Sequence, residues 1–313
     1  MTASFKLAAS SLVLTAMMGL AACQQPANPP AQDAVPATET EPTASAAKIH
    51  AFKLGQLDLV ALEDGIISMP MAESPWIKAG AEAQVVTDLF AKAGLPTDKV
   101  ELGVHPLLVK DGDRLILIDA GAGGQMGTAN QLVSALKAAG YEPAQVTDVL
   151  ISHAHGDHVG GLVKDGALTF PEAKIWFSAA EWRAAQEDAS IKSVTEPISS
   201  KVQTFDGEAQ ISPSIRSVRL QGHTAGHTGY EIRSGNDRLI YMGDTFHGHA
   251  VPIPAPNLPN VWDNDRDVAA ATRNQYLADG VASGVLYYGP HLPFPGLGTI
   301  ARDGDTYVWK PAR

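Results

Sequence analysis

The stretch that decides the fold is ISHAHGDHVGG, residues 151–161. Four side chains able to bind a metal fall within six positions of it: His153, His155, Asp157 and His158. The competing interpretation is a polar loop with solvated histidines. With only 10 histidines in 313 residues, three in six positions are improbable by chance. A buried strand followed by glycines is also the usual setting for functional side chains on a rigid scaffold. The stretch therefore predicts a metal site.

The spacing inside this stretch predicts two ions rather than one. His153 and His155 are two residues apart, so in a strand or the loop after it they project to the same side and can share an ion. Asp157 and His158 follow Gly156, where the backbone can turn them towards a second ion. A dinuclear site needs further ligands elsewhere in the chain.

Three later segments supply such ligands in the same setting. LQGHTAGHTGY contains His223, LIYMGDTFHG contains Asp244, and VLYYGPHLPFPG contains His291. Each follows an apolar strand that opens into a Gly- or Pro-rich loop, which core packing does not explain.

The rest of the chain predicts an α/β fold. Strands are expected at 57–65, 146–155 and 284–289. Hairpins are expected at 105–121, with its turn at 111–113, at 228–245, and in the C-terminal segment, with its turn at 303–305. Helices are expected at 129–140 and 268–282. Two sets of strands with helices at their flanks suggest two α/β layers packed sheet to sheet, an αββα sandwich.

With these motifs, the chain from Ile49 to Arg313 resembles the metallo-β-lactamase superfamily. The resemblance is strongest to the methyl parathion hydrolase and lactonase-like group, through GHTAGHT, MGDT and the tail HLPFPGLGTIARDGDTYVW. It implies the αββα fold, with His153, His155 and His223 on one metal and Asp157, His158 and His291 on the other. Asp244 would bridge the two divalent ions. His/Asp sites accept Zn, Mn, Co or Fe, and zinc is the expected metal.

The chemistry of such a site agrees with hydrolysis. Between two cations about 3.5–4 Å apart, a water is acidified towards neutral pH and becomes the nucleophile, a metal-bound hydroxide. Asp157 and Asp244 are the catalytic carboxylates expected beside it. No Ser or Cys nucleophile is required.

The substrate class follows from the predicted pocket walls. Residues 69–80, 251–260 and 291–298 are largely apolar and show no cluster of Lys or Arg, which favours neutral, hydrophobic small molecules: esters or lactones, with organophosphotriesters as further substrates. One alternative is a β-lactamase, which a cephalosporin assay would reveal. The other is a non-catalytic metal-binding lipoprotein, which would bind metal without activity.

Several other residues have two open interpretations. His227 either orients a ligand or simply packs in the core, and Asp119 either steadies the motif loop or caps a turn. His247 and His249 are expected to be solvated or to line the pocket rather than to bind metal. Six aromatic residues are candidates for the pocket, although most are expected in the core: Trp76, Phe90, Trp176, Phe177, Trp182 and Phe294.

The N-terminus predicts export. Residues 1–22 have Lys6 followed by an apolar run of 16 residues from Leu7 to Ala22, typical of a signal peptide and short for a membrane helix. Leu20 to Cys23 resembles the lipobox of bacterial lipoproteins, which implies cleavage before Cys23, acylation of its thiol and, with Gln24 next, sorting to the outer membrane facing the periplasm. An ordinary secreted protein is the alternative.

Composition sets the remaining boundaries. Residues 23–47 carry the lipidated Cys23 and a Pro-, Ala- and Thr-rich segment that predicts a disordered tether, and residues 48–313 form the hydrolase domain. Cys23 is the only cysteine, so no disulfide is expected. A formal charge of −11 and the lack of a basic stripe exclude nucleic acid as a partner. The sequence leaves open whether the protein forms a homodimer.

Overall fold

The computed structural model describes residues 47–312. The predicted signal peptide, Cys23 and nearly all of the predicted tether lie outside the described residues. The described residues belong to one compact unit. Within residues 47–312, no helix combines the length and the apolar character needed to cross a membrane.

The first sheet has seven strands and combines antiparallel and parallel pairing. Its first four strands pair antiparallel, and β6, β7, β10 and β11 pair parallel. The predicted hairpin at 111–113 is confirmed as β5 and β6, with Gly112 at φ 59° in the turn. In spatial order the strands are β1 (Ile49–Leu54), β2 (Leu57–Leu62), β5 (Leu107–Asp111), β6 (Arg114–Ile118), β7 (Asp148–Leu150), β10 (Lys174–Ser178) and β11 (Val202–Phe205).

The second sheet has six strands in sequence order. Only β14 and β15 pair parallel, and α7 connects them. The predicted hairpins at 228–245 and 303–305 are confirmed as β13–β14 and β16–β17. The strands are β12 (Ile215–Arg219), β13 (Thr228–Ser234), β14 (Asp237–Tyr241), β15 (Leu286–Tyr288), β16 (Leu297–Asp303) and β17 (Thr306–Pro311).

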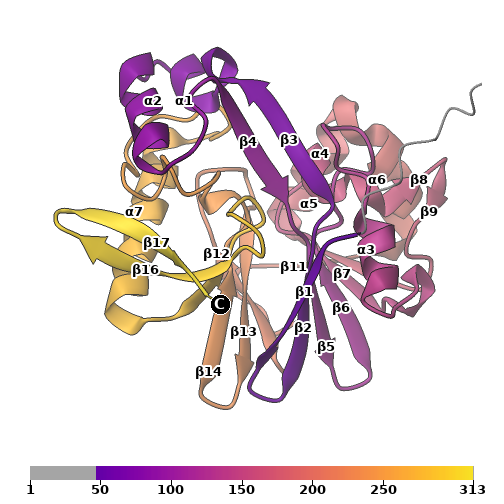
Figure 1. The fold of residues 1–313 in the computed structure, drawn as a ribbon. Coiled ribbons are helices and arrows are strands. Elements are labelled where there is room, and N and C mark those ends of the chain that lie inside the picture. Colours follow the sequence, from indigo (N-terminus) through magenta and orange to yellow (C-terminus); the bar gives the residue numbers. More distant parts are fainter. Residues whose placement is uncertain (1–46, 313) are drawn as a thin grey trace, which may run out of the picture. The chain divides into compact units, whose positions relative to one another are not determined.

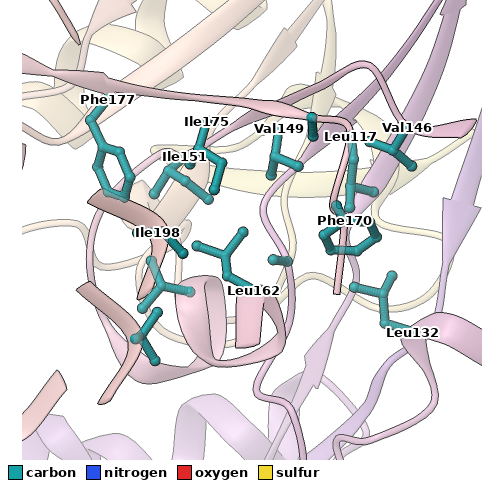
Figure 2. Packing of buried hydrophobic residues seen from close by; sticks show 14 of the residues in the cluster. Leu117, Leu132, Val146, Val149, Ile151, Leu162, Phe170, Ile175, Phe177 and Ile198 are labelled. Atoms are coloured by element: carbon teal, nitrogen blue, oxygen red, sulfur yellow. The ribbon is translucent and has the colours of Figure 1, made fainter. Parts of the chain in front are cut away.

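Helices cover the outer face of each sheet, as Figure 1 shows. On the first sheet they are α3 (Leu132–Ala138), α5 (Ala179–Glu187) and α6 (Lys192–Ile198), and Figure 2 shows part of the apolar cluster beneath them. On the second sheet α7 (Arg266–Ser283) packs through Leu277 against Ile240 and Tyr287. A third cluster, with Leu59, Ile116 and Tyr230, lies between the sheets. These layers are the predicted αββα sandwich.

An arm that the sequence did not predict projects from one end of the sandwich (Figure 1). It consists of the antiparallel strands β3 (Gly65–Pro70) and β4 (Lys99–Val104), with α1 (Pro75–Lys78) and α2 (Ala83–Lys92) between them in sequence. Trp76 and Phe90, with ring centroids 6.0 Å apart, belong to a small core that also includes Ala250 and Val251 from the segment after η6. Residues 69–80 therefore mostly build this arm.

The predicted strand at 146–155 is wrong in length. It ends at Leu150, because the N–H of Ser152 donates to the Asp119 side chain instead of to a neighbouring strand. A short helix, α4 (Gly156–Val159), then begins inside the motif. The remaining elements are the strands β8 (Val163–Lys164) and β9 (Ala167–Leu168) and the 3-10 turns η1 (Met71–Glu73), η2 (Pro143–Gln145), η3 (Gly160–Leu162), η4 (Ala189–Ile191), η5 (Ser199–Lys201) and η6 (Gly243–Thr245).

Candidate metal centre

The fold brings all seven predicted ligand side chains to one end of the sandwich. They follow the carboxyl ends of four strands: β7, β12, β14 and β15. His153 and His155 lie in the loop after β7, Asp157 and His158 in α4, His223 after β12, Asp244 in η6 and His291 after β15. Strands of both sheets therefore contribute, which explains why the ligands are spread over 139 positions of the chain.

The side chains form two groups, and in each the potential ligand atoms lie within 4.8 Å of one another. The first group is His153, His155, His223 and Asp244, and the second is Asp157, His158 and His291. Nε2 of His153 lies 2.9 Å from Nδ1 of His155, and the latter lies 3.1 Å from Nε2 of His223. Three nitrogens thus converge on one point.

Asp244 lies between the groups and presents one oxygen to each. Its Oδ2 is 3.4 Å from Nε2 of both His153 and His223. Its Oδ1 is 3.1 Å from Nε2 of both His158 and His291. This is the arrangement expected of a carboxylate that bridges two cations.

The buried polar atoms of the centre test whether metal ions fit. Nε2 of His158 and Oδ1 of Asp244 are buried, and neither has a hydrogen-bond partner among the described residues. Burying such atoms unsatisfied costs about 1–3 kcal/mol each. Imidazole nitrogens and carboxylate oxygens are ligands of divalent transition metals, so the donor set fits two such ions.

Hydrogen bonds behind the ligands fix which histidine nitrogen faces the centre. Nδ1 of His158 donates to Oδ2 of Asp119 at 2.7 Å, and Nδ1 of His291 donates to the Gly103 carbonyl at 2.6 Å. Nδ1 of His223 faces Asp263 at 3.2 Å. Because each Nδ1 carries the proton, the lone pair of each Nε2 is directed into the centre.

Asp119 and Asp263 each have further partners besides the histidine ligand. Asp119 also accepts hydrogen bonds from the hydroxyls of Ser152 and Tyr241, at 2.7 and 2.8 Å. It therefore steadies the motif loop, and its backbone has a φ of 60°. Asp263, which the sequence analysis missed, is buried and paired with Arg273 at 2.9 Å.

The electrostatics reflect crowded histidines around buried carboxylates. Burial opposes charge on His158, but Asp244, Asp157 and Asp119 raise its pKa well above the usual value. For Asp244, burial alone would raise the pKa, but the surrounding histidines, His158 and His291 first, hold the pKa well below the usual value. The carboxylates thus attract positive charge into the centre, which protons or metal ions can supply.

Glu181 connects the two loops that carry the three histidines of the first group. Its carboxylate accepts hydrogen bonds of 2.8 Å from the N–H of Ala154, the hydroxyl of Thr224 and the N–H of Gly226. It is buried at the start of α5. A lone glutamate in a helix gives no sequence signal for such a role, and the sequence analysis missed it.

The other histidines also have clear positions. His227 is not in either group, and its Nε2 accepts a hydrogen bond of 3.0 Å from the N–H of Asp244. It therefore orients a candidate ligand. His247 is buried beside Asp244, and His249 lies on a neighbouring cavity of about 260 Å³.

A cavity of about 270 Å³ opens over the two groups. Its walls are the apolar side chains Ile67, Met69, Leu102, Met126 and Trp262, and its floor includes Asp157, Asp244, His247 and His291. Of the predicted walls, residues 69–80 contribute only Met69, residues 291–298 only His291, and residues 251–260 nothing. None of the six aromatic candidates lines it. Trp262, which the sequence analysis did not consider, does.

Comparison with known proteins shows the family of the chain. A family model described as the metallo-beta-lactamase superfamily matches residues 101–280, more than half of the chain. The chain belongs to the metallo-beta-lactamase superfamily. The matched part contains six of the seven candidate ligands and the strands β5 to β14.

Relatives within the superfamily cover most of the described chain. A protein named "Probable metallo-hydrolase" from Mycobacterium tuberculosis is 26% identical over 248 residues, which are 66% of this chain and 77% of that protein. The solved structure of AidC, a dizinc quorum-quenching lactonase in complex with a product, is 26% identical, with a TM-score of 0.78 over 86% of this chain and 98% of AidC. The hydrolase AbOPH is 29% identical, with a TM-score of 0.77 over 86% and 99% of the two chains.

Proposed function

We propose that this protein is a dinuclear metal-dependent hydrolase of neutral, hydrophobic lactones and aryl esters. The observation that carries the proposal is the apolar cavity directly over Asp157, Asp244 and His291. None of the described residues that line it is a lysine or an arginine. Such walls favour an uncharged acyl group over a phosphomonoester or a free carboxylate.

The ligands divide between two metal positions. His153, His155 and His223 would hold one ion, Asp157, His158 and His291 the other, and Asp244 both. Divalent ions in such a site acidify water and polarise a carbonyl or phosphoryl oxygen. The proposal of zinc is supported by the likeness to AidC, which is described as a dizinc enzyme.

The chain's own residues would bind and orient the substrate and manage protons. Leu102, Met126 and Trp262 would pack against the acyl group and exclude water from it. Asp157 lies on the cavity floor with its Oδ2 3.4 Å from Nε2 of His291. There its carboxylate can accept a proton and return it to the departing oxygen.

A lactone is the favoured substrate for two reasons. Its leaving group is an oxygen that remains tethered to the acyl group, so both can stay in one small cavity. The likeness to AidC, whose structure holds the product N-hexanoyl-L-homoserine, supports the same class. An amide-like nitrogen leaving group needs a stronger proton donor, so β-lactams should react slowly, and organophosphotriesters at an intermediate rate.

A comparison of substrates on one metal-reconstituted preparation tests this proposal. N-hexanoyl-L-homoserine lactone, an aryl acetate, an organophosphotriester and a chromogenic cephalosporin are each assayed for kcat/KM. We expect the lactone or the aryl ester to rank first and the cephalosporin last. A cephalosporin preferred over both would overturn the substrate assignment, and metal binding without any turnover would favour a non-catalytic protein.

For localisation, we propose a lipid anchor on Cys23 that holds the protein at the outer membrane, facing the periplasm. The support is the lipobox-like Leu20 to Cys23. In a bacterial host, the protein should fractionate with membranes, and Cys23→Ala should move it to the soluble periplasmic fraction. A soluble wild type without acyl chains by mass spectrometry would contradict the anchor.

A further inference from the structure

His247 is the one histidine on the cavity floor that belongs to neither metal group. It follows η6, three residues after Asp244, and its side chain is only 2% exposed. Its ring lies 5.0 Å from that of Trp262 and is tilted against it. A buried polar ring in this position needs partners for both nitrogens.

The partner of Nδ1 is Asn260, and a second contact of Asn260 shows which of the two groups donates the hydrogen bond. The backbone N–H of Trp262, which can only donate, lies 2.9 Å from Oδ1 of Asn260. The amide oxygen must therefore face Trp262, and Nδ2 must face Nδ1 of His247, at 3.2 Å. Because Nδ2 can only donate, Nδ1 accepts and carries no proton. The ring is neutral and its proton is on Nε2.

The partner of Nε2 is Asp244. The distance from Nε2 of His247 to Oδ2 of Asp244 is 3.1 Å. Oδ2 is the oxygen that faces His153 and His223. Since the backbone N–H of Asp244 is bonded to His227, Asp244 is held at both its backbone and its carboxylate.

We propose that His247 is a positioning residue: Asn260 fixes it as the Nε2–H tautomer, and its N–H holds the Asp244 carboxylate with one oxygen towards each metal group. The inference rests on the proposed function only in that Asp244 serves both metals. Asp119, Asp263 and Gly103 orient histidine ligands by hydrogen bonds from behind. His247 would do the same for the carboxylate between the two groups. A carboxylate is free to rotate about its Cβ–Cγ bond, so a fixed donor on one oxygen selects one orientation.

The first test is the protonation of His247 in the zinc-loaded protein. Long-range ¹H–¹⁵N NMR distinguishes the two neutral tautomers, and the His247 signals are assigned by their loss in His247→Gln. We expect a proton on Nε2 and none on Nδ1. A proton on Nδ1 would overturn the proposal, whatever the substrate of the enzyme.

The second test compares two variants for zinc affinity and kinetics. His247→Gln keeps an N–H donor near the position of Nε2, whereas His247→Phe keeps a ring against Trp262 but has no donor. Losing such an outer hydrogen bond typically weakens metal affinity about 10–100-fold. In His247→Phe we expect this loss of zinc affinity, with kcat reduced in parallel and KM little changed. In His247→Gln both zinc affinity and kcat should recover substantially.

The outcomes separate the two proposals. Equal zinc affinity in His247→Phe and wild type would overturn the positioning role, even if lactones prove to be the substrates. If the lactone ranking fails but the tautomer and zinc affinities are as expected, only the substrate assignment is wrong. Should His247→Phe fail to fold, Asn260→Leu removes the amide donor instead, and a wild-type tautomer in that variant would contradict the role of Asn260.

Discussion

The carboxylate of Asp119 accepts a hydrogen bond of 2.7 Å from Nδ1 of His158, a residue 39 positions later in the chain. Asp119 stands at the end of β6 and His158 in α4, so this bond ties a strand end to the metal motif. It determines that Nε2 of His158, not Nδ1, faces Asp244. The candidate centre therefore depends on contacts outside the ligand set.

Asp119→Asn should weaken metal binding. An amide N–H₂ in place of one carboxylate oxygen would face the donors of Ser152, His158 or Tyr241, and His158 would lose its fixed tautomer. We expect zinc affinity to fall about 10–100-fold, measured by competition with a chromophoric chelator. Asp111→Asn is the matched control, since Asp111 accepts hydrogen bonds from Ser212 and Ser214 away from the centre. Equal losses in both variants would argue against a specific role for Asp119.

Glu181→Ala should loosen the first metal group. The change leaves the N–H groups of Ala154 and Gly226 without their acceptor, at a cost of about 1–3 kcal/mol for each group that stays buried. We expect a lower free energy of unfolding in urea and weaker binding of one of two zinc ions. Glu187→Ala, at an exposed site in the same helix, should change neither quantity. Unaltered zinc binding in Glu181→Ala would contradict the link between the two loops.

Gly161→Ala should destabilise the fold beside the motif. A Cβ atom there would overlap the carbonyl oxygen of Ala120, which is backbone and cannot move aside alone. Overpacking of this kind costs about 1–3 kcal/mol or more. Gly156→Ala is the control for stability, because its Cβ would meet only Sδ of Met126 at 3.6 Å. Thermal unfolding of both metal-free variants checks the difference, and similar Tm values would disprove the close packing at Gly161.

The stability contributed by Glu231 should depend on pH. Burial opposes its ionisation, but hydrogen bonds from Arg233, Arg216 and Arg238 lower its pKa from 4.5 to about 2. A lowered folded-state pKa adds stability that is fully present above pH 4.5 and is lost as the pH falls towards 2.

Glu231→Gln should therefore lower the free energy of unfolding most at neutral pH. Because the ionic hydrogen bonds are lost, we expect the free energy of unfolding to be about 1–3 kcal/mol below that of wild type at pH 7. At pH 3.5 the difference from wild type should be smaller. Urea unfolding at pH 7, 5 and 3.5 measures it. Asp58→Asn, which breaks the exposed Lys53–Asp58 pair, should stay within about 0.5 kcal/mol. A difference for Glu231→Gln that grows on acidification would contradict this account.

Local patterns in the sequence predicted the hairpins and picked out the seven side chains that the structure brings together. The turns at Gly112 and Gly304 are set by adjacent residues, and every ligand lies in the segment that follows an apolar strand. In contrast, Asp263 and Glu181 act on residues far away in the chain, and nothing beside them marks that role. His247 is only three residues from Asp244, but its partner Asn260 comes 13 positions later. The arm of β3 and β4 was missed because its strands are separated by two helices, so no turn between them indicates a hairpin.

Titration of zinc into the chelator-stripped protein shows whether hydrolysis needs two bound metal ions, when metal content and hydrolysis of the preferred lactone or ester are followed together. We expect the stripped protein to be inactive and to regain activity as about two zinc ions bind per chain. Asp244→Ala should bind less zinc and recover little activity. Full activity in the stripped, metal-free wild type would contradict the account.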